Sequence, residues 1–144
     1  MEPYRNQRII KVIRELYFMG YPSFAGQFEA RFPVHQGPTG ETKQEVPVPM
    51  VMLVATAVSV FKMLQVMCGA NMDYQLYVTL REWHSGECQA IDFSANSYLD
   101  VYIGNMDSIN LYRENHNAAY HDLMAYIYSQ AWYWYHLWFY TDTN

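Results

Sequence analysis

Apolar residues recur every three to four positions in the first part of the chain, which is the period of an amphipathic helix. Ile9, Ile13 and Leu16 share one face of a helix over residues 5–19. Gly20 follows this segment and is a helix stop signal. The pattern therefore predicts a first helix with one buried side.

Three later segments show the same spacing. Pro49 suits the first position of a helix, because the missing amide hydrogen of proline costs nothing there. Ser94 can cap a helix over residues 95–113, and Asn115 or Asn117 can cap the last helix. The apolar positions at helical spacing are Met50, Leu53, Val54 and Ala57; then Leu99, Tyr102 or Ile103, Met106, Ile109 and Tyr112 or Arg113; then Tyr120, Leu123, Met124, Ile127 and Tyr128. Residues 76–83 are typical of the end of another helix, closed by Ser85 and Gly86.

Residues 33–49 break the helical pattern. They contain four prolines and two glycines, with Glu41, Lys43 and Glu45 between them, which predicts a solvated loop. No pair of alternating strands joined by a tight two-residue turn occurs in the sequence. We therefore expect an all-α fold, an irregular bundle of about four to six helices with this loop after the first helical region, in one domain over residues 1–144.

Composition narrows the class of protein. Hydrophobic residues make up 51% of the 144 residues and charged residues 16%, which excludes global disorder. The net charge of −5 makes nucleic acid a poor partner, because binding to nucleic acid depends on neutralising phosphates.

The location is predicted to be intracellular, either cytoplasmic or nuclear. Cys68 and Cys88 are too few for a disulfide framework and form no C-x-x-C pair. Charged residues interrupt the first 20 positions, so they do not form a signal peptide. The longest apolar run, residues 47–61, is shorter than the roughly 20 residues that a membrane span needs.

Several clusters contain residues that could form a metal or an acid–base site. His84, Glu87 and Cys88 offer suitable zinc ligands, but no second Cys/His pair completes a set of four. His116 and His121, with Glu114 and Asp122 beside them, are five positions apart and so lie off a common helix face. Capping and surface roles are therefore predicted for them, and no metal or cofactor is expected.

Other charged groups are predicted to form solvated faces. Asp100 and Asp107 lie near one face of their helix, and Asp92 precedes it. The basic residues of the first helix drift around it at three-residue spacing; they are Arg5, Arg8, Lys11 and Arg14. The chain has no Walker loop, G-x-G-x-x-G or G-x-S-x-G motif, and its pattern predicts no catalytic residue.

Four segments carry a resemblance to a known family. They are PVPMVMLVATA (47–57), LREWHSGE (80–87), FSANSYLDVY (93–102) and RENHNAAYHDLMA (113–125). Together they resemble an α-helical family of basidiomycete fungi known as domain of unknown function 6532, over most of residues 24–131. The resemblance implies a helical fold and carries over no activity, cofactor or catalytic residue. It marks a candidate surface made of Phe93, Ser94, Asn96, Tyr98, Asp100, Tyr102, His116 and His121.

Residues 58–75 interrupt one helix of that family pattern. Joining Ala57 to Leu76 restores helical spacing through Tyr77 and Leu80. We hypothesise that residues 58–75 are a translated retained intron, and that the aperiodic aromatic tail, residues 132–144, arose in the same way. An RNA-sequencing read across the locus without a splice junction at either place would contradict this.

Two functions remain open at this point. The first is a non-catalytic interaction module that recognises a protein or peptide through an apolar and tyrosine-rich surface. The second is an enzyme or nucleic-acid-associated domain with a site near Asp92–Tyr102 and His116–His121. The oligomeric state is not predicted.

Overall fold

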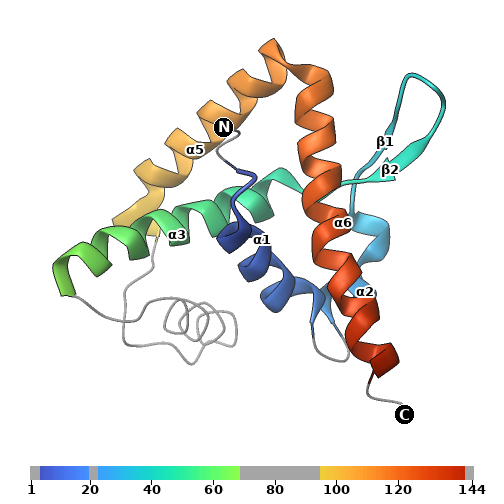
Figure 1. Ribbon diagram of the computed structural model, residues 1–144. Helices are drawn as coiled ribbons and strands as arrows, with labels where there is room; N and C mark the ends of the chain where they lie inside the picture. The colour runs from blue at the N-terminus through green and yellow to red at the C-terminus, as the bar shows by residue number, and fades with distance from the viewer. Residues whose placement is uncertain (1–3, 20–22, 69–94, 142–144) are drawn as a thin grey trace.

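A computed structural model describes residues 4–19, 23–68 and 95–141 of the chain (Figure 1). Within them lie five α-helices and one antiparallel pair of strands. The helices are α1 (Gln7–Ile13), α2 (Phe24–Gln27), α3 (Val48–Cys68), α5 (Ala95–Asn115) and α6 (Asn117–Thr141). The strands are β1 (Val34–Gln36) and β2 (Thr42–Gln44). The predicted, mainly helical bundle is therefore confirmed, with a small sheet added to it.

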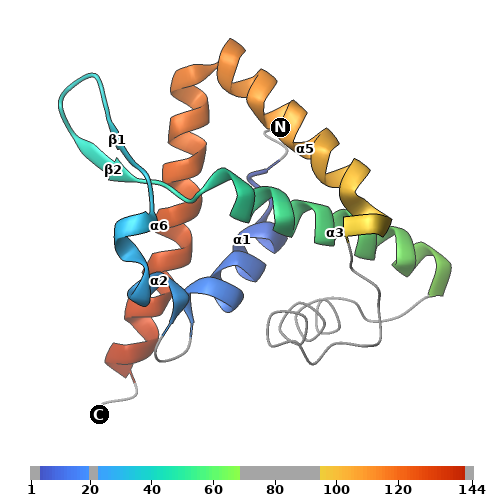
Figure 2. The same cartoon turned by 180° about the vertical axis from the view of Figure 1, so that it is seen from behind.

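The three long helices form the three sides of a triangle. In both views α3 begins beside the middle of α6, passes the first half of α5 and extends beyond it, and α5 leads back to α6 at a sharp corner (Figures 1 and 2). Helix α1 packs against α3 and α6, and a π-helical segment, Arg14–Phe18, continues it. The β-hairpin projects from the outer side of α6.

The core lies where α1, α3 and α6 meet. Most of the predicted apolar positions of these helices are buried, and Leu16 and Leu53 are half-buried. Helix α1 lies at the centre, because it packs against both α3 and α6. Phe18 is completely buried, and its ring makes edge contacts with the rings of Phe32, Tyr128 and Trp132. The fully buried aliphatic side chains include Ile13, Met52, Val54, Ile109, Leu123, Met124 and Ile127.

The apolar pattern of α5 is wider than its buried face. Tyr102, Met106 and Ile109 pack toward the core, as their spacing predicts. Leu99 and Ile103, which share that spacing, are 48% and 46% exposed. The reason is that α5 lies at the edge of the bundle and contacts it along one narrow side. The part of the apolar stripe that contains Leu99 and Ile103 lies outside this contact and stays exposed.

Helix α6 continues into the aromatic tail. Trp132 stacks on Tyr128 with ring centroids 5.9 Å apart, whereas Tyr133 is 61% exposed. In α3, Val58 and Val60 are buried, so the start of the suspected insert packs into the core. Residues 69–75 and 142–144 lie outside the described residues, and the intron hypothesis stays a prediction.

Three further expectations also fall outside the described residues. They are the stop at Gly20, the helix end over 76–86 and the cap at Ser94. No helix in the described part of the chain has the length and apolar character needed to cross a bilayer.

A buried threonine connects α3 to α5. The Thr56 hydroxyl donates a hydrogen bond to the Met52 carbonyl at 2.7 Å and accepts one from the Asn105 side-chain amide at 3.0 Å. We expect Thr56→Val to lower the free energy of unfolding by about 1–2 kcal/mol, because Asn105 then loses its acceptor in a partly buried place. Urea unfolding measures this difference. Thr42→Val, at an exposed strand position, is the control, and an equal loss in both variants would contradict the role of the bond.

Candidate functional site at the hairpin and α6

The segment expected to be a solvated loop is mostly exposed, but it forms a β-hairpin, so the prediction that it has no regular structure is wrong. β1 and β2 pair with His35 opposite Lys43, and residues 37–41 connect them. Gly40 has a φ of 86°, a conformation that favours glycine. The pairing extends beyond the strands, because the Glu45 amide donates to the Pro33 carbonyl at 2.8 Å. The hairpin thus has a defined register that sequence periodicity did not reveal.

The hairpin is docked on α6 by buried residues that follow β2. Glu45 is 4% exposed and Val46 is 1% exposed. The Val46 amide donates to the Met124 carbonyl of α6 at 3.4 Å. Because side chains alternate along a strand, and cross-strand partners share a face, His35, Lys43 and Glu45 belong to one face of the hairpin. All three reach groups on α6.

His35, Glu45 and His121 form a compact group, which we call the His–Glu–His cluster. One nitrogen or oxygen atom of each side chain lies within 4.8 Å of the others. The Glu45 carboxylate oxygen Oε1 is 2.7 Å from His121 Nδ1. The imidazole rings of His35 and His121 are stacked, with centroids 3.6 Å apart and planes inclined by only 6°.

The chemistry of the cluster follows from the hydrogen bond to Glu45. An ionised carboxylate can only accept, so His121 donates from Nδ1. A neutral His121 ring then keeps the lone pair of Nε2 for another partner. A buried carboxylate also requires a partner, because its desolvation is otherwise costly. The cluster therefore supplies two imidazoles and a buried carboxylate at one point between the hairpin and α6.

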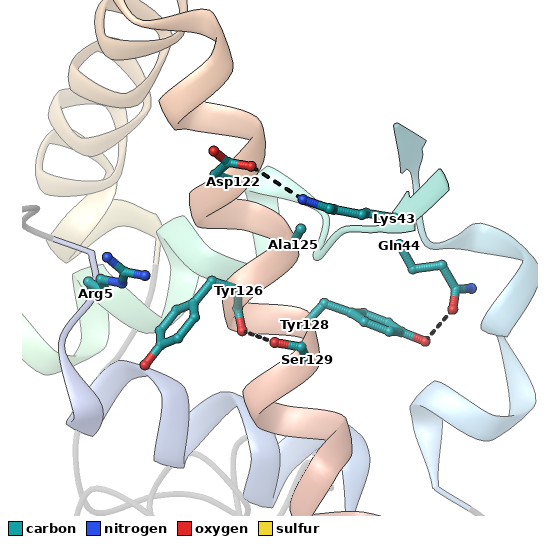
Figure 3. Close-up of a pocket in the computed structure, with 8 residues that line it drawn as sticks. All are labelled: Arg5, Lys43, Gln44, Asp122, Ala125, Tyr126, Tyr128 and Ser129. Atoms are coloured by element: carbon teal, nitrogen blue, oxygen red, sulfur yellow. Dashed lines mark hydrogen bonds and ion pairs between the residues drawn. The ribbon is translucent and has the colours of Figure 1, made fainter. Parts of the chain in front are cut away.

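A hollow of about 460 Å³ lies beside the cluster on the exposed side of α6; we call it the α6 hollow (Figure 3). Its lining residues are Arg5, Lys43, Gln44, Asp122, Ala125, Tyr126, Tyr128 and Ser129. The N-terminal segment forms one rim and the hairpin the other, while α6 provides the floor.

Polar contacts hold the rims in place. The Tyr128 hydroxyl donates to Gln44 Oε1 at 2.8 Å, and burial raises the pKa of this phenol, with a further rise from the Glu29 carboxylate. Tyr128 therefore stays protonated and able to donate. The Arg5 guanidinium lies 4.2 Å from the centroid of the Tyr126 ring, a cation–π contact. The rim ion pair between Lys43 and Asp122 is 3.6 Å long and solvent-exposed, so it contributes little to stability.

The structure separates the residues of the predicted family surface. Asn96 and Asp100 are exposed on the first half of α5, beside the half-buried Tyr98 and Tyr102. The rise of a helix places Tyr98 about 25 Å from the corner that precedes α6. Phe93 and Ser94 lie outside the described residues.

The two histidines of this surface have different surroundings. His116 is exposed at the corner between α5 and α6, with its ring 5.4 Å from that of Tyr112, and it borders a second hollow of about 290 Å³. His121 points to the hairpin instead. The described part of the chain therefore does not bring the two halves of the predicted surface into one pocket.

The other candidate groups are placed as follows. Asp100 and Asp107 are exposed, as expected for a solvated face, and Asp92 lies outside the described residues, as do His84, Glu87 and Cys88. Arg8 and Lys11 are exposed on α1. Arg5, in contrast, contributes to the rim of the α6 hollow.

Sequence reasoning missed His35 and Glu45. The sequence held one signal for them, the alternation of side chains along a strand. Lys43 and Glu45 are two positions apart, so they share a face in an extended segment. His35 lies before Gly37 and Gly40, close enough in sequence to pair with Lys43 across a short connection. Each strand has only three residues and little apolar alternation, so the usual strand pattern was absent.

These features define a class: a helical domain with a β-hairpin docked on its last long helix. The chain belongs to the family described as Domain of unknown function (DUF6532), whose profile matches residues 1–112. No curated protein and no solved structure matches the chain. The matched region starts and ends earlier than the resemblance had indicated, so segment 113–125 lies beyond it. His35 and Glu45 lie within the match, whereas His121 does not.

Proposed function

We propose that this domain is a non-catalytic interaction module that binds a short peptide segment of a partner protein in the α6 hollow. One observation carries the proposal: Tyr126 and Tyr128 line a concave surface between two cationic rims. The volume of about 460 Å³ falls in the range of roughly 300–1,000 Å³ common for ligand sites.

The residue types in the hollow are those that dominate protein interfaces. Tyrosine and arginine are enriched among the side chains that contribute most to binding, because each combines a large contact area with polar groups. The half-buried Tyr126 ring and the Arg5 guanidinium above it offer such a surface. Ala125 also lines the hollow, and its small side chain leaves space for a side chain of the partner.

Charge indicates the chemistry of the peptide. The lining contains two cationic side chains, Arg5 and Lys43, and one acidic side chain, Asp122. This local excess of positive charge contrasts with the net charge of −5 of the whole chain. The hollow therefore suits a peptide with an acidic residue for the rims and an apolar or aromatic residue for the floor.

The test is selection from random linear peptides displayed on phage, with the full-length chain as bait. We expect the selected peptides to share an acidic residue next to an aromatic or aliphatic one. Tyr126→Ala is expected to weaken a selected peptide at least tenfold, because it removes the floor of the site. Lys43→Glu is expected to weaken it several-fold, and added salt should reduce the affinity of the wild-type chain. Fluorescence anisotropy of a labelled peptide measures each affinity.

Matched variants serve as controls. Tyr133→Ala removes an exposed tyrosine of the same helix, and Lys11→Glu makes the same charge change on α1. Both should leave the affinity unchanged. The proposal fails if no peptide binds, or if the controls weaken binding as much as the variants of the hollow.

A further inference from the structure

We infer that the His–Glu–His cluster binds one divalent transition-metal ion of the zinc class, through His35, Glu45 and His121. The inference does not depend on peptide binding in the α6 hollow. It concerns the contact between the hairpin and α6, and none of its three residues lines the hollow.

The donor set favours this class of ion. Imidazole nitrogen and carboxylate oxygen are established zinc ligands, and two histidines with one glutamate occur in zinc sites that keep an open position. Calcium and magnesium prefer oxygen ligands, so two imidazoles disfavour them. The three donor atoms already lie within 4.8 Å of one another, so side-chain rotation can bring them to one ion.

The hairpin and α6 hold the three residues close together before any metal ion binds. The three residues come from β1, from the end of β2 and from α6, so the backbone of each is held by a regular element or its hydrogen bonds. The Glu45 side chain is 6% exposed and that of His121 is 22% exposed. A carboxylate this well buried next to imidazoles gives a cation a stronger electrostatic site than a surface carboxylate does.

Metal binding requires a defined change within the cluster. The two rings are nearly parallel and 3.6 Å apart, so an ion in the plane of one ring lies outside the plane of the other. A ring must therefore rotate out of the stack when both nitrogens bind. The 2.7 Å hydrogen bond between Glu45 and His121 is then replaced by bonds to the ion. Three protein ligands leave at least one position for water or a further ligand.

The test is titration of the chelator-treated full-length chain with Zn²⁺ alone, followed by isothermal calorimetry. We expect one ion per chain and a higher melting temperature in its presence. His35→Ala, Glu45→Gln and His121→Ala should each weaken binding at least tenfold. His116→Ala, which removes an exposed histidine outside the cluster, is the matched control and should bind as the wild type does.

Two readouts separate a metal site from a purely structural role of the cluster. His35→Ala keeps the hydrogen bond between Glu45 and His121, so the variant should remain folded while its zinc affinity falls at least tenfold. The Co²⁺-substituted chain should have a visible spectrum typical of nitrogen and oxygen ligands, without the charge-transfer band of a thiolate. A thiolate band, unchanged zinc affinity in His35→Ala, or no binding of one ion per chain would overturn the inference.

Discussion

Phe18→Ala is expected to lower the free energy of unfolding by about 3–5 kcal/mol, enough to unfold much of a marginally stable domain. Phe18 is completely buried where α1, α6 and the segment before the hairpin meet. Its ring centroid lies 5.6–5.9 Å from those of Phe32, Tyr128 and Trp132. Truncation to alanine leaves a cavity among three aromatic rings, which cannot collapse without moving α6.

Phe28→Ala is the control for this prediction. Phe28 is 37% exposed and packs mainly against Phe24, so the same substitution should cost about 1 kcal/mol or less. Urea unfolding followed by circular dichroism measures both variants. If Phe18→Ala costs no more than Phe28→Ala, the rings around Phe18 are not the centre of the core.

His121→Ala is expected to lower the free energy of unfolding by about 3 kcal/mol. This is the low end of the range for breaking a buried ion pair, because the His121 side chain is 22% exposed. The substitution leaves the carboxylate of Glu45 buried without its 2.7 Å partner. The hairpin then loses one of its main attachments to α6. Chemical denaturation without metal measures the loss.

Asp122→Ala is the matched control, because it removes the neighbouring contact between α6 and the hairpin. Its ion pair with Lys43 is exposed, so the expected cost is about 0–1 kcal/mol. The Glu45→Ala, His121→Ala double variant should cost less than the sum of the single changes, since the two groups interact directly. Strict additivity would show that they stabilise the protein independently.

The elements predicted best from the sequence are those whose pattern lies within a single helix. The stripes of Met50–Ala57 and Tyr120–Tyr128 are set by 3.6-residue periodicity within single helices. The structure buries every predicted position of both stripes except Leu53, which is half-buried. Leu99 and Ile103 have the same periodicity but are exposed. Periodicity determines which residues share a face, whereas tertiary packing determines how much of that face is covered.

The candidate site depends on contacts that no local pattern contains. Glu45 and His121 are 76 positions apart, and Tyr128 and Gln44 are 84 apart. The sequence places His121 beside His116 and Asp122 and predicts a capping or surface role for it. Its actual partners come from a segment rich in proline and glycine that was expected to be solvated. The proline, glycine and charged residues of that segment are typical of loops, yet they also build a hairpin whose inner face is polar.

Helix α6 lies entirely outside the region matched by the family profile, yet it supplies six of the buried apolar residues of the described chain: Tyr120, Leu123, Met124, Ile127, Tyr128 and Ala131. A recombinant fragment cut at the family boundary would lack one wall of the core. Phe18, Ile13 and their neighbours on α1 and α3 would then face water as a contiguous apolar patch, a surface that promotes aggregation. Expression trials on this domain should therefore extend the cloned region through the whole of α6.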